Sequence, residues 1–133
     1  MLKFSTRLIK KLETIKIGIV YLYGSKAEGI NNRNSDFDLG IVFTHSPIKK
    51  QSLDLYSKLH HIFSKEFPKE NIDIALLQFS PVNFQFEVIN KGKILLEIDS
   101  EFRANFEERI IKDYLFFAPL QKEYEKVTME TFS

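Results

Sequence analysis

The sequence lacks several features that identify common classes of protein. It has no cysteine, which excludes a disulfide framework, a thiolate zinc site and a cysteine nucleophile. Its 19 Lys and Arg residues nearly balance 18 Asp and Glu residues, so a net charge of +1 predicts no bulk coating of nucleic acid. No apolar run approaches the about 18 residues that a membrane span needs, and polar Glu13 and Thr14 follow the basic N-terminus. We therefore expect a soluble cytoplasmic protein with no membrane contact and no direct nucleic-acid binding.

The apolar residues that are present are enough for one core. The chain has 133 residues, 44% of them hydrophobic and 13 of them Phe, which predicts a single domain over residues 1–133. Hydrophobic periodicity predicts helices over residues 2–15, 52–67, 81–91 and from 101, and strands over 17–23, 36–43, 71–78 and 93–98. We expect Ser80 to cap the third helix with Pro81 at its first position, and Pro119 to end the last helix. The C-terminal helix and tail would cover about 101–133, with a mobile tail after Gln121. This order predicts a mixed α/β or α+β fold, a small sheet flanked by helices.

Three carboxylates interrupt the apolar context of two predicted strands. Asp36 and Asp38 open the second strand, and Asp73 lies near the start of the third. Residues two apart in a strand point to the same face, so Asp36 and Asp38 converge, and Asp73 joins them if the two strands are neighbours. Clustered carboxylates repel one another and resist burial, which makes a divalent cation their natural partner. The pattern predicts a magnesium site formed by these three residues.

A second motif lies upstream of these carboxylates. Gly24 and Ser25 end the first predicted strand, where backbone N–H groups and a small hydroxyl can approach a phosphate closely. Lys26 and Arg33 follow in the same loop and are candidate nucleotide-binding cations. A phosphate-binding turn that faces a metal-binding cluster is suited to phosphoryl or nucleotidyl transfer.

These residues carry a resemblance to a known family. The segments Gly24-Ser25, Asp36-Phe37-Asp38-Leu39 and Asn71-Ile72-Asp73-Ile74 resemble the polymerase-beta-type nucleotidyltransferase core, and the short chain is similar to the minimal nucleotidyltransferases of prokaryotes. The resemblance implies that Asp36, Asp38 and Asp73 bind Mg²⁺, two ions in all, and that Asp73 assists deprotonation of the acceptor hydroxyl. It implies that Gly24 and Ser25 contact the triphosphate of ATP. Where family members often carry an arginine in the Ser-x-x-x-Gly segment, this chain has Glu28, so Lys26 or Arg33 could supply that cation.

The resemblance also implies a biological role. Minimal nucleotidyltransferases act as antitoxins of helical HEPN-type ribonucleases and add AMP from ATP to a tyrosine of the toxin. The sequence leaves two alternatives open, a non-catalytic antitoxin that masks its partner by contact and a transferase that acts on a small-molecule hydroxyl. The aromatic segment from Tyr114 to Leu120 either covers the sheet or forms a surface for a homo- or hetero-oligomer.

Overall fold

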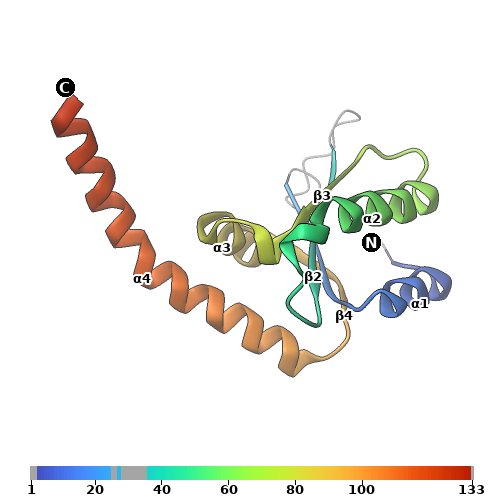
Figure 1. Cartoon of the computed structure of the whole chain (residues 1–133). Helices are drawn as coiled ribbons and strands as arrows, with labels where there is room; N and C mark the ends of the chain where they lie inside the picture. The colour runs from blue at the N-terminus through green and yellow to red at the C-terminus, as the bar shows by residue number, and fades with distance from the viewer. Residues whose placement is uncertain (1–2, 25–26, 28–35, 133) are drawn as a thin grey trace.

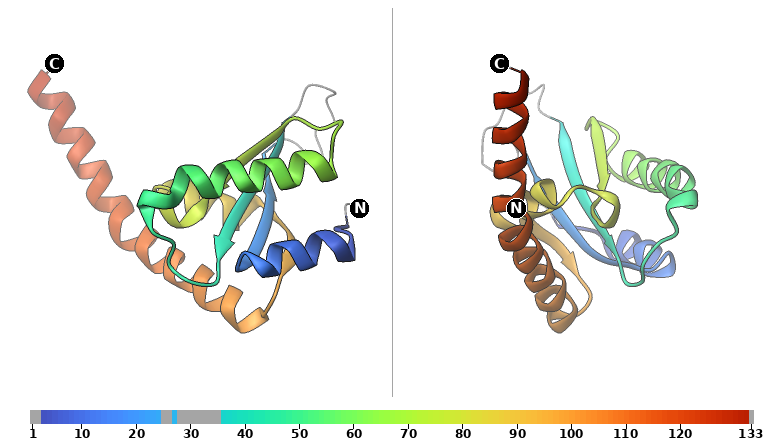
Figure 2. Two further views of the ribbon diagram at one scale, coloured as in Figure 1. Left: turned by 45° about the vertical axis from the view of Figure 1, so that its right-hand side comes forward. Right: turned by 60° about the vertical axis from the view of Figure 1, so that its left-hand side comes forward.

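A four-stranded mixed sheet with helices on both faces forms the centre of the protein (Figures 1 and 2). The computed structural model describes residues 3–24, 27 and 36–132. Its elements in chain order are α1 (Thr6–Thr14), β1 (Ile17–Tyr23), β2 (Phe37–Phe43), the 3₁₀ turn η1 (Lys49–Gln51), α2 (Ser52–Glu66), β3 (Ile72–Leu76), the 3₁₀ turn η2 (Leu77–Phe79), α3 (Val82–Lys91), β4 (Lys93–Glu97) and α4 (Ser100–Phe132). The predicted fold class and the predicted order of helices and strands are confirmed.

The strand order is β3-β2-β1-β4. β1 pairs antiparallel with both β2 and β4, whereas β2 and β3 run parallel. The parallel pair needs a crossover, and α2 provides it on one face of the sheet. As a result the starts of β2 and β3 lie side by side at one end of the sheet.

The core has two layers, one on each face of the sheet. The larger layer packs α1 and α2 on the sheet through residues such as Leu8, Leu12, Leu59 and Phe63. The other layer packs α3 and the beginning of α4 on the opposite face, around Tyr21. In β2 the side chains of Phe37, Leu39, Ile41 and Phe43 all enter the larger layer, so the residues between them face α3 and α4.

The ends of helices and strands show where local sequence signals predict the structure correctly and where they do not. Ser5 caps α1, since its hydroxyl accepts a hydrogen bond from Leu8 N at 3.1 Å. β3 ends earlier than expected because the chain turns into η2, where the side chain of Gln78 bonds both the N–H and the carbonyl of Phe43. The prediction for Ser80 is wrong: Pro81 occupies the cap position of α3, and the Ser80 hydroxyl donates to Leu76 O at 3.0 Å.

The C-terminal helix differs most from the expectation. α4 does not end at Pro119 but contains it and continues to Phe132, so the predicted mobile tail after Gln121 is helical. Proline in a helix interior removes one backbone hydrogen bond and costs about 3 kcal/mol, usually with a kink, but it need not end the helix when turns on both sides are well formed. The axis of α4 changes direction in its second half, which extends away from the rest of the protein (Figure 1). No helix in the described part of the chain is both long and apolar enough to span a membrane.

Candidate active site

Two of the predicted carboxylates lie side by side on neighbouring strands. In the parallel pairing of β2 with β3, Asp38 and Asp73 are register partners. Their sequence neighbours on both strands point into the core under α2, so both carboxylates project from the opposite face of the sheet. Neighbouring strands lie about 4.8 Å apart, which brings the two side chains within reach of a single ligand. Asp38 is half-buried and Asp73 is exposed.

The third carboxylate lies at the very start of the same strand. Asp36 is exposed and directly precedes β2. Asn71, the residue before β3, donates a hydrogen bond from Nδ2 to Asp36 Oδ1 at 2.7 Å, and Phe37 N donates to Asn71 O at 2.8 Å. These bonds fix the start of β2 against the start of β3, where the three carboxylates lie.

Burial and like charge make this corner of the sheet electrostatically unfavourable for anions. Burial, and after it the negative charges of Asp73 and Asp36, together raise the pKa of Asp38 from its ordinary value of 3.8 to about 6. The pKa of Tyr23 is also raised, first by burial and then by the charges of Asp73 and Asp38. A cation bound beside Asp38 would remove the repulsion that disfavours the ionisation of this carboxyl group.

The end of β1 closes the site from the other side. Tyr23 is the register partner of Asp38 on β1, and Gly24 follows it with φ of +76°, a conformation that favours glycine. A Cβ at position 24 would overlap Asp38 Oδ2 and would lie 3.2 Å from Asp38 Cγ. Two separate features therefore favour glycine at position 24: the positive φ of the turn, and the Asp38 carboxylate, which occupies the space of a Cβ.

Comparison with known proteins agrees with this arrangement. The sequence model described as "Polymerase beta, Nucleotidyltransferase" matches residues 6–101, which include β1, β2 and β3 and all three carboxylates. The chain belongs to the polymerase beta nucleotidyltransferase family. No curated protein sequence matches the chain.

Several solved structures share the fold of this nucleotidyltransferase. A toxin–antitoxin structure with AMP-PNP is 22% identical, with a TM-score of 0.66 over 98% of this chain and 100% of that chain. The structure of a tri-AMPylated Shewanella oneidensis HEPN toxin in complex with MNT antitoxin is 19% identical, with a TM-score of 0.62 over 96% of this chain and 94% of that chain. The MntA-HepT toxin–antitoxin structure is 20% identical, with a TM-score of 0.60 over 96% and 95% of the two chains. At these identities the similarity establishes the fold.

Part of the predicted nucleotide site lies outside the described residues. Ser25, Lys26 and Arg33, the candidate phosphate contacts, and Glu28, which departs from the family pattern, all fall in that segment. Their roles remain predictions of the sequence. Gly24 is the member of this set whose conformation the structure gives.

The described carboxylates fit a divalent cation in chemistry but do not form a closed metal cage. Within residues 3–24, 27 and 36–132, no three His, Cys, Asp or Glu side chains stand in a geometry that could hold a metal ion. Asp38 and Asp73 supply two adjacent carboxylates, and Asp36 accepts a hydrogen bond from Asn71. An open, oxygen-only set of this kind matches Mg²⁺, which commonly keeps waters and substrate phosphates among its ligands.

The structure adds two residues that the sequence analysis did not single out. Asn71 holds Asp36, and Tyr23 lies opposite Asp38 in the sheet. Tyr23 also contacts α3, since its ring meets that of Phe84 edge-on with centroids 5.4 Å apart. Its position next to Gly24 was a signal in the sequence, but its place beside Asp38 depends on the strand register, which the sequence does not state. Asn71 gave no signal beyond its position two residues before Asp73.

Proposed function

We propose that this nucleotidyltransferase is a Mg²⁺-dependent protein adenylyltransferase and an antitoxin, which transfers AMP from ATP to a tyrosine hydroxyl of a cognate HEPN-type toxin. The observation that carries the proposal is the pairing of Asp38 with Asp73 on adjacent parallel strands, with Gly24 packed against the Asp38 carboxylate. Membership of the nucleotidyltransferase family supports the reaction class. The solved relatives support the nucleotide and the partner, since one contains AMP-PNP and another contains an AMPylated HEPN toxin.

In this proposal Asp36, Asp38 and Asp73 would hold the metal. A Mg²⁺ ion held there would supply positive charge to neutralise the triphosphate and would help to align it for in-line attack. Burial of Asp38 beside two further carboxylates disfavours its negative charge. A cation bound beside Asp38 would offset this cost by neutralising the repulsion between the carboxylates. Asn71 holds the Asp36 carboxylate by a hydrogen bond.

The transfer itself is balanced without a further reactant. The tyrosine oxygen forms a bond to the α-phosphorus of ATP, the bond between that phosphorus and the bridging oxygen to the β-phosphate breaks, and pyrophosphate leaves. Asp73, which is exposed and next to Asp38, accepts the hydroxyl proton. The backbone turn at Gly24 allows the triphosphate to approach the carboxylates without meeting a side chain.

The experiment is intact-mass spectrometry of the cognate toxin after incubation with the purified protein, ATP and MgCl₂. Wild type should add one or more AMP masses to the toxin, and Asp38→Asn and Asp73→Asn should each abolish the addition. Asp54→Asn, an equivalent change in the first turn of α2, is the matched control and should retain it. EDTA should prevent the addition by wild type.

Two outcomes would contradict the proposal. Unchanged AMP addition by the Asp38 and Asp73 variants would remove the carboxylates from the reaction. No addition by wild type, together with a stable complex in which the toxin is inactive, would instead identify an antitoxin that acts by contact alone.

A further inference from the structure

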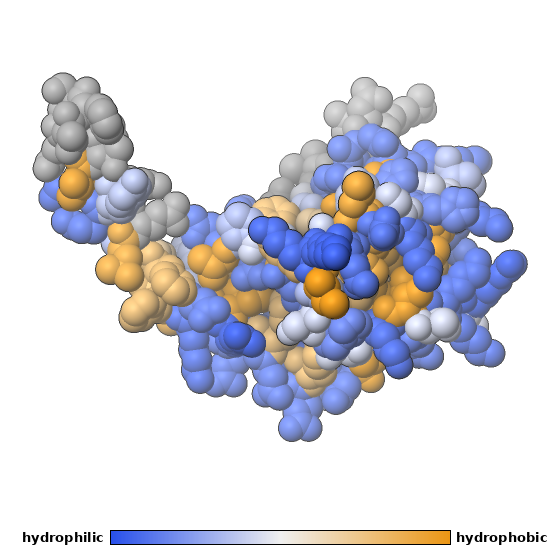
Figure 3. Space-filling model, viewed as in Figure 1, coloured by the Kyte–Doolittle hydropathy of each residue, from blue (hydrophilic) through white to orange (hydrophobic). Residues whose placement is uncertain are grey.

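Exposed apolar side chains are concentrated on the second half of α4. Among the described residues, seven of the ten exposed large hydrophobic side chains lie on this helix: Ile111, Leu115, Phe116, Phe117, Leu120, Tyr124 and Val127. Phe116 is 65% exposed and Leu120 is 57% exposed. Figure 3 shows apolar side chains along the part of α4 that extends from the body of the protein. Concentrated apolar exposure of this kind marks a protein-binding surface.

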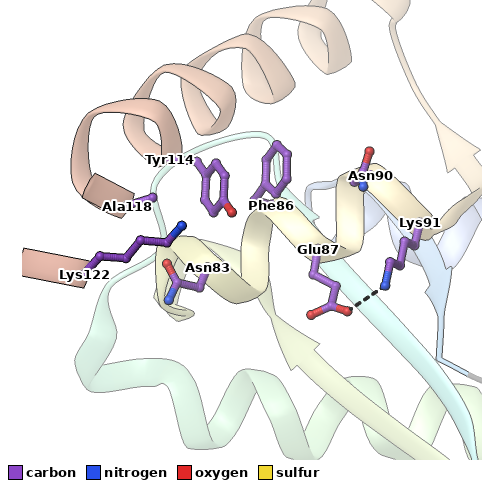
Figure 4. Close-up of a pocket in the computed structure, with 8 residues that line it drawn as sticks. All are labelled: Asn83, Phe86, Glu87, Asn90, Lys91, Tyr114, Ala118 and Lys122. Carbon is purple, nitrogen blue, oxygen red and sulfur yellow. Dashed lines mark hydrogen bonds and ion pairs between the residues drawn. The ribbon is translucent and has the colours of Figure 1, made fainter. Parts of the chain in front are cut away.

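The helix leaves the body at a defined point. The ring of Tyr114 on α4 stacks on that of Phe86 on α3, with centroids 3.9 Å apart and planes 3° apart. Figure 4 shows this pair beside a pocket of about 390 Å³, with Ala118 and Lys122 on the following turns of α4. We call residues 115–132, beyond this contact, the outer half of α4.

The side of α4 that faces α3 continues through Ala118 and Lys122, whereas a different side of the outer half continues the part of α4 that lines a second pocket. Arg109 and Asp113 line a pocket of about 650 Å³ together with Phe102 and Phe106, between α4 and the ends of β2 and η2. Phe116 and Leu120 follow Asp113 at intervals of three and four residues, so they lie on the same side of the helix. We call Arg109, Asp113, Phe116 and Leu120 the α4 ridge. Lys122 and Lys126 lie on the opposite side of the helix.

The ridge lies outside the residues that the family model matches. The nucleotidyltransferase match ends at residue 101, at the start of α4, and the three candidate carboxylates lie within it. The pocket at its base adjoins Phe43, at the far end of β2 from Asp38, roughly 17 Å away at 3.3 Å per residue. A partner bound there would leave the carboxylates accessible.

Charge favours a different protein over a second copy of this chain. If two copies paired antiparallel with Phe116 of one against Leu120 of the other, Asp113 would face Glu123, and like charges would meet beside the apolar contact. Apolar residues at intervals of three and four are the pattern by which helices bind helices. The HEPN toxin of the proposed function would be such a partner, since the family resemblance implies a helical protein.

We propose that the α4 ridge and the pocket at its base bind a helix of the cognate toxin, with an apolar toxin side chain in the pocket. This inference rests on the proposed function for the identity of the partner. It separates the surface that holds the toxin from the carboxylates that modify it, which gives the acceptor tyrosine a high local concentration at the site.

The test compares two charge-matched double variants of the full-length protein. Phe116→Glu with Leu120→Glu adds two negative charges to the ridge, and Lys122→Gln with Lys126→Gln changes the charge equally on the opposite side. Toxin affinity is measured by calorimetry, and the mass of each protein alone and in complex by light scattering. We expect toxin binding to weaken at least about 100-fold in the ridge variant and less than about threefold in the control. Both variants should keep the wild-type melting temperature, since the changed side chains are exposed.

The readouts distinguish this inference from the proposed function. If wild type transfers no AMP but the ridge variant still loses toxin binding, the docking surface stands and the enzymatic proposal fails. If transfer occurs, the ridge variant should show a raised KM for toxin with kcat near that of wild type. Unchanged toxin affinity in the ridge variant would overturn the inference, as would wild type that does not bind the toxin. It would also be overturned if wild type is a dimer that the ridge variant converts to monomers while toxin affinity stays the same.

Discussion

The substitution Gly24→Ala tests the geometry of the site most directly. Gly24 has φ of +76°, and the space where a Cβ would stand is filled by Asp38 Oδ2. An alanine here must adopt a left-handed backbone conformation, and Asp38 must turn its carboxylate away. The change thus disturbs a metal-binding candidate without altering any polar group.

The loss of stability expected for Gly24→Ala has two parts. A non-glycine residue in the left-handed region costs about 1–2 kcal/mol, which lowers the melting temperature of a domain of this size by roughly 4–8 °C. Displacement of the Asp38 carboxylate lowers the free energy of unfolding further, and this second part disappears when Asp38 is replaced by alanine. Because in-line transfer depends on aligned groups, a shift of about 1 Å should lower AMP transfer by about 100-fold.

A double-mutant cycle separates the two parts. Thermal unfolding is measured for wild type, Gly24→Ala, Asp38→Ala and the double variant. The cost of Gly24→Ala should fall to the backbone part alone in the Asp38→Ala background, because the overlapping oxygen is gone. An equal cost in both backgrounds would refute the packing argument, and a wild-type melting temperature in Gly24→Ala would refute the positive φ as well.

Three further predictions concern stability. The folded protein holds the Asp38 proton up to about pH 6, whereas the unfolded chain releases it near pH 3.8, so raising the pH between these values favours unfolding. Asp38→Asn in EDTA should therefore have a higher melting temperature than wild type at pH 7.5, and the difference in melting temperature should shrink toward pH 4. Lys16 has φ of 67° after α1, so Lys16→Gly should raise the free energy of unfolding by about 1 kcal/mol, while Lys11→Gly within α1 should lower it by about as much. The buried Tyr21 hydroxyl donates to Glu107 Oε1 at 2.9 Å, so Tyr21→Phe should lower the free energy of unfolding by about 2 kcal/mol in urea titrations, and no loss would mean that this bond does not help hold α4 on β1.

The strands and most helices could be predicted because their signals are local. Residues 17–23 form an uninterrupted apolar run between polar neighbours, and β1 has these same bounds. The apolar stripe from Leu53 to Phe67 predicts α2, although only Leu59 and Phe63 of that helix are fully buried. Hydrophobic periodicity predicts which side of a helix or strand is apolar, whereas the burial of that side depends on which other elements pack against it.

Pairing between elements could not be predicted in the same way. The neighbouring positions of Asp38 and Asp73 depend on a parallel register set by the crossover through α2, which no local pattern specifies. The sequence supported this pairing only as a condition, that the two strands be adjacent. Asn71 and Tyr23 were overlooked for the same reason, since their place in the site comes from register.

Pro119 is a case in which a strong local signal gives the wrong prediction, because proline predicts the end of a helix and α4 continues past it. Apolar residues at helical spacing continue across the proline, since Leu120 follows Phe116 by four residues, and α4 includes both. A proline costs a fixed amount, whereas each additional helical turn on either side adds its own hydrogen bonds. Phe116 and Leu120 gain little burial from this in an isolated chain, because they are 65% and 57% exposed. If the docking proposal holds, a partner that buries the ridge would add to the stability of the helix beyond Pro119, which would link the persistence of the helix to the docking role inferred for it.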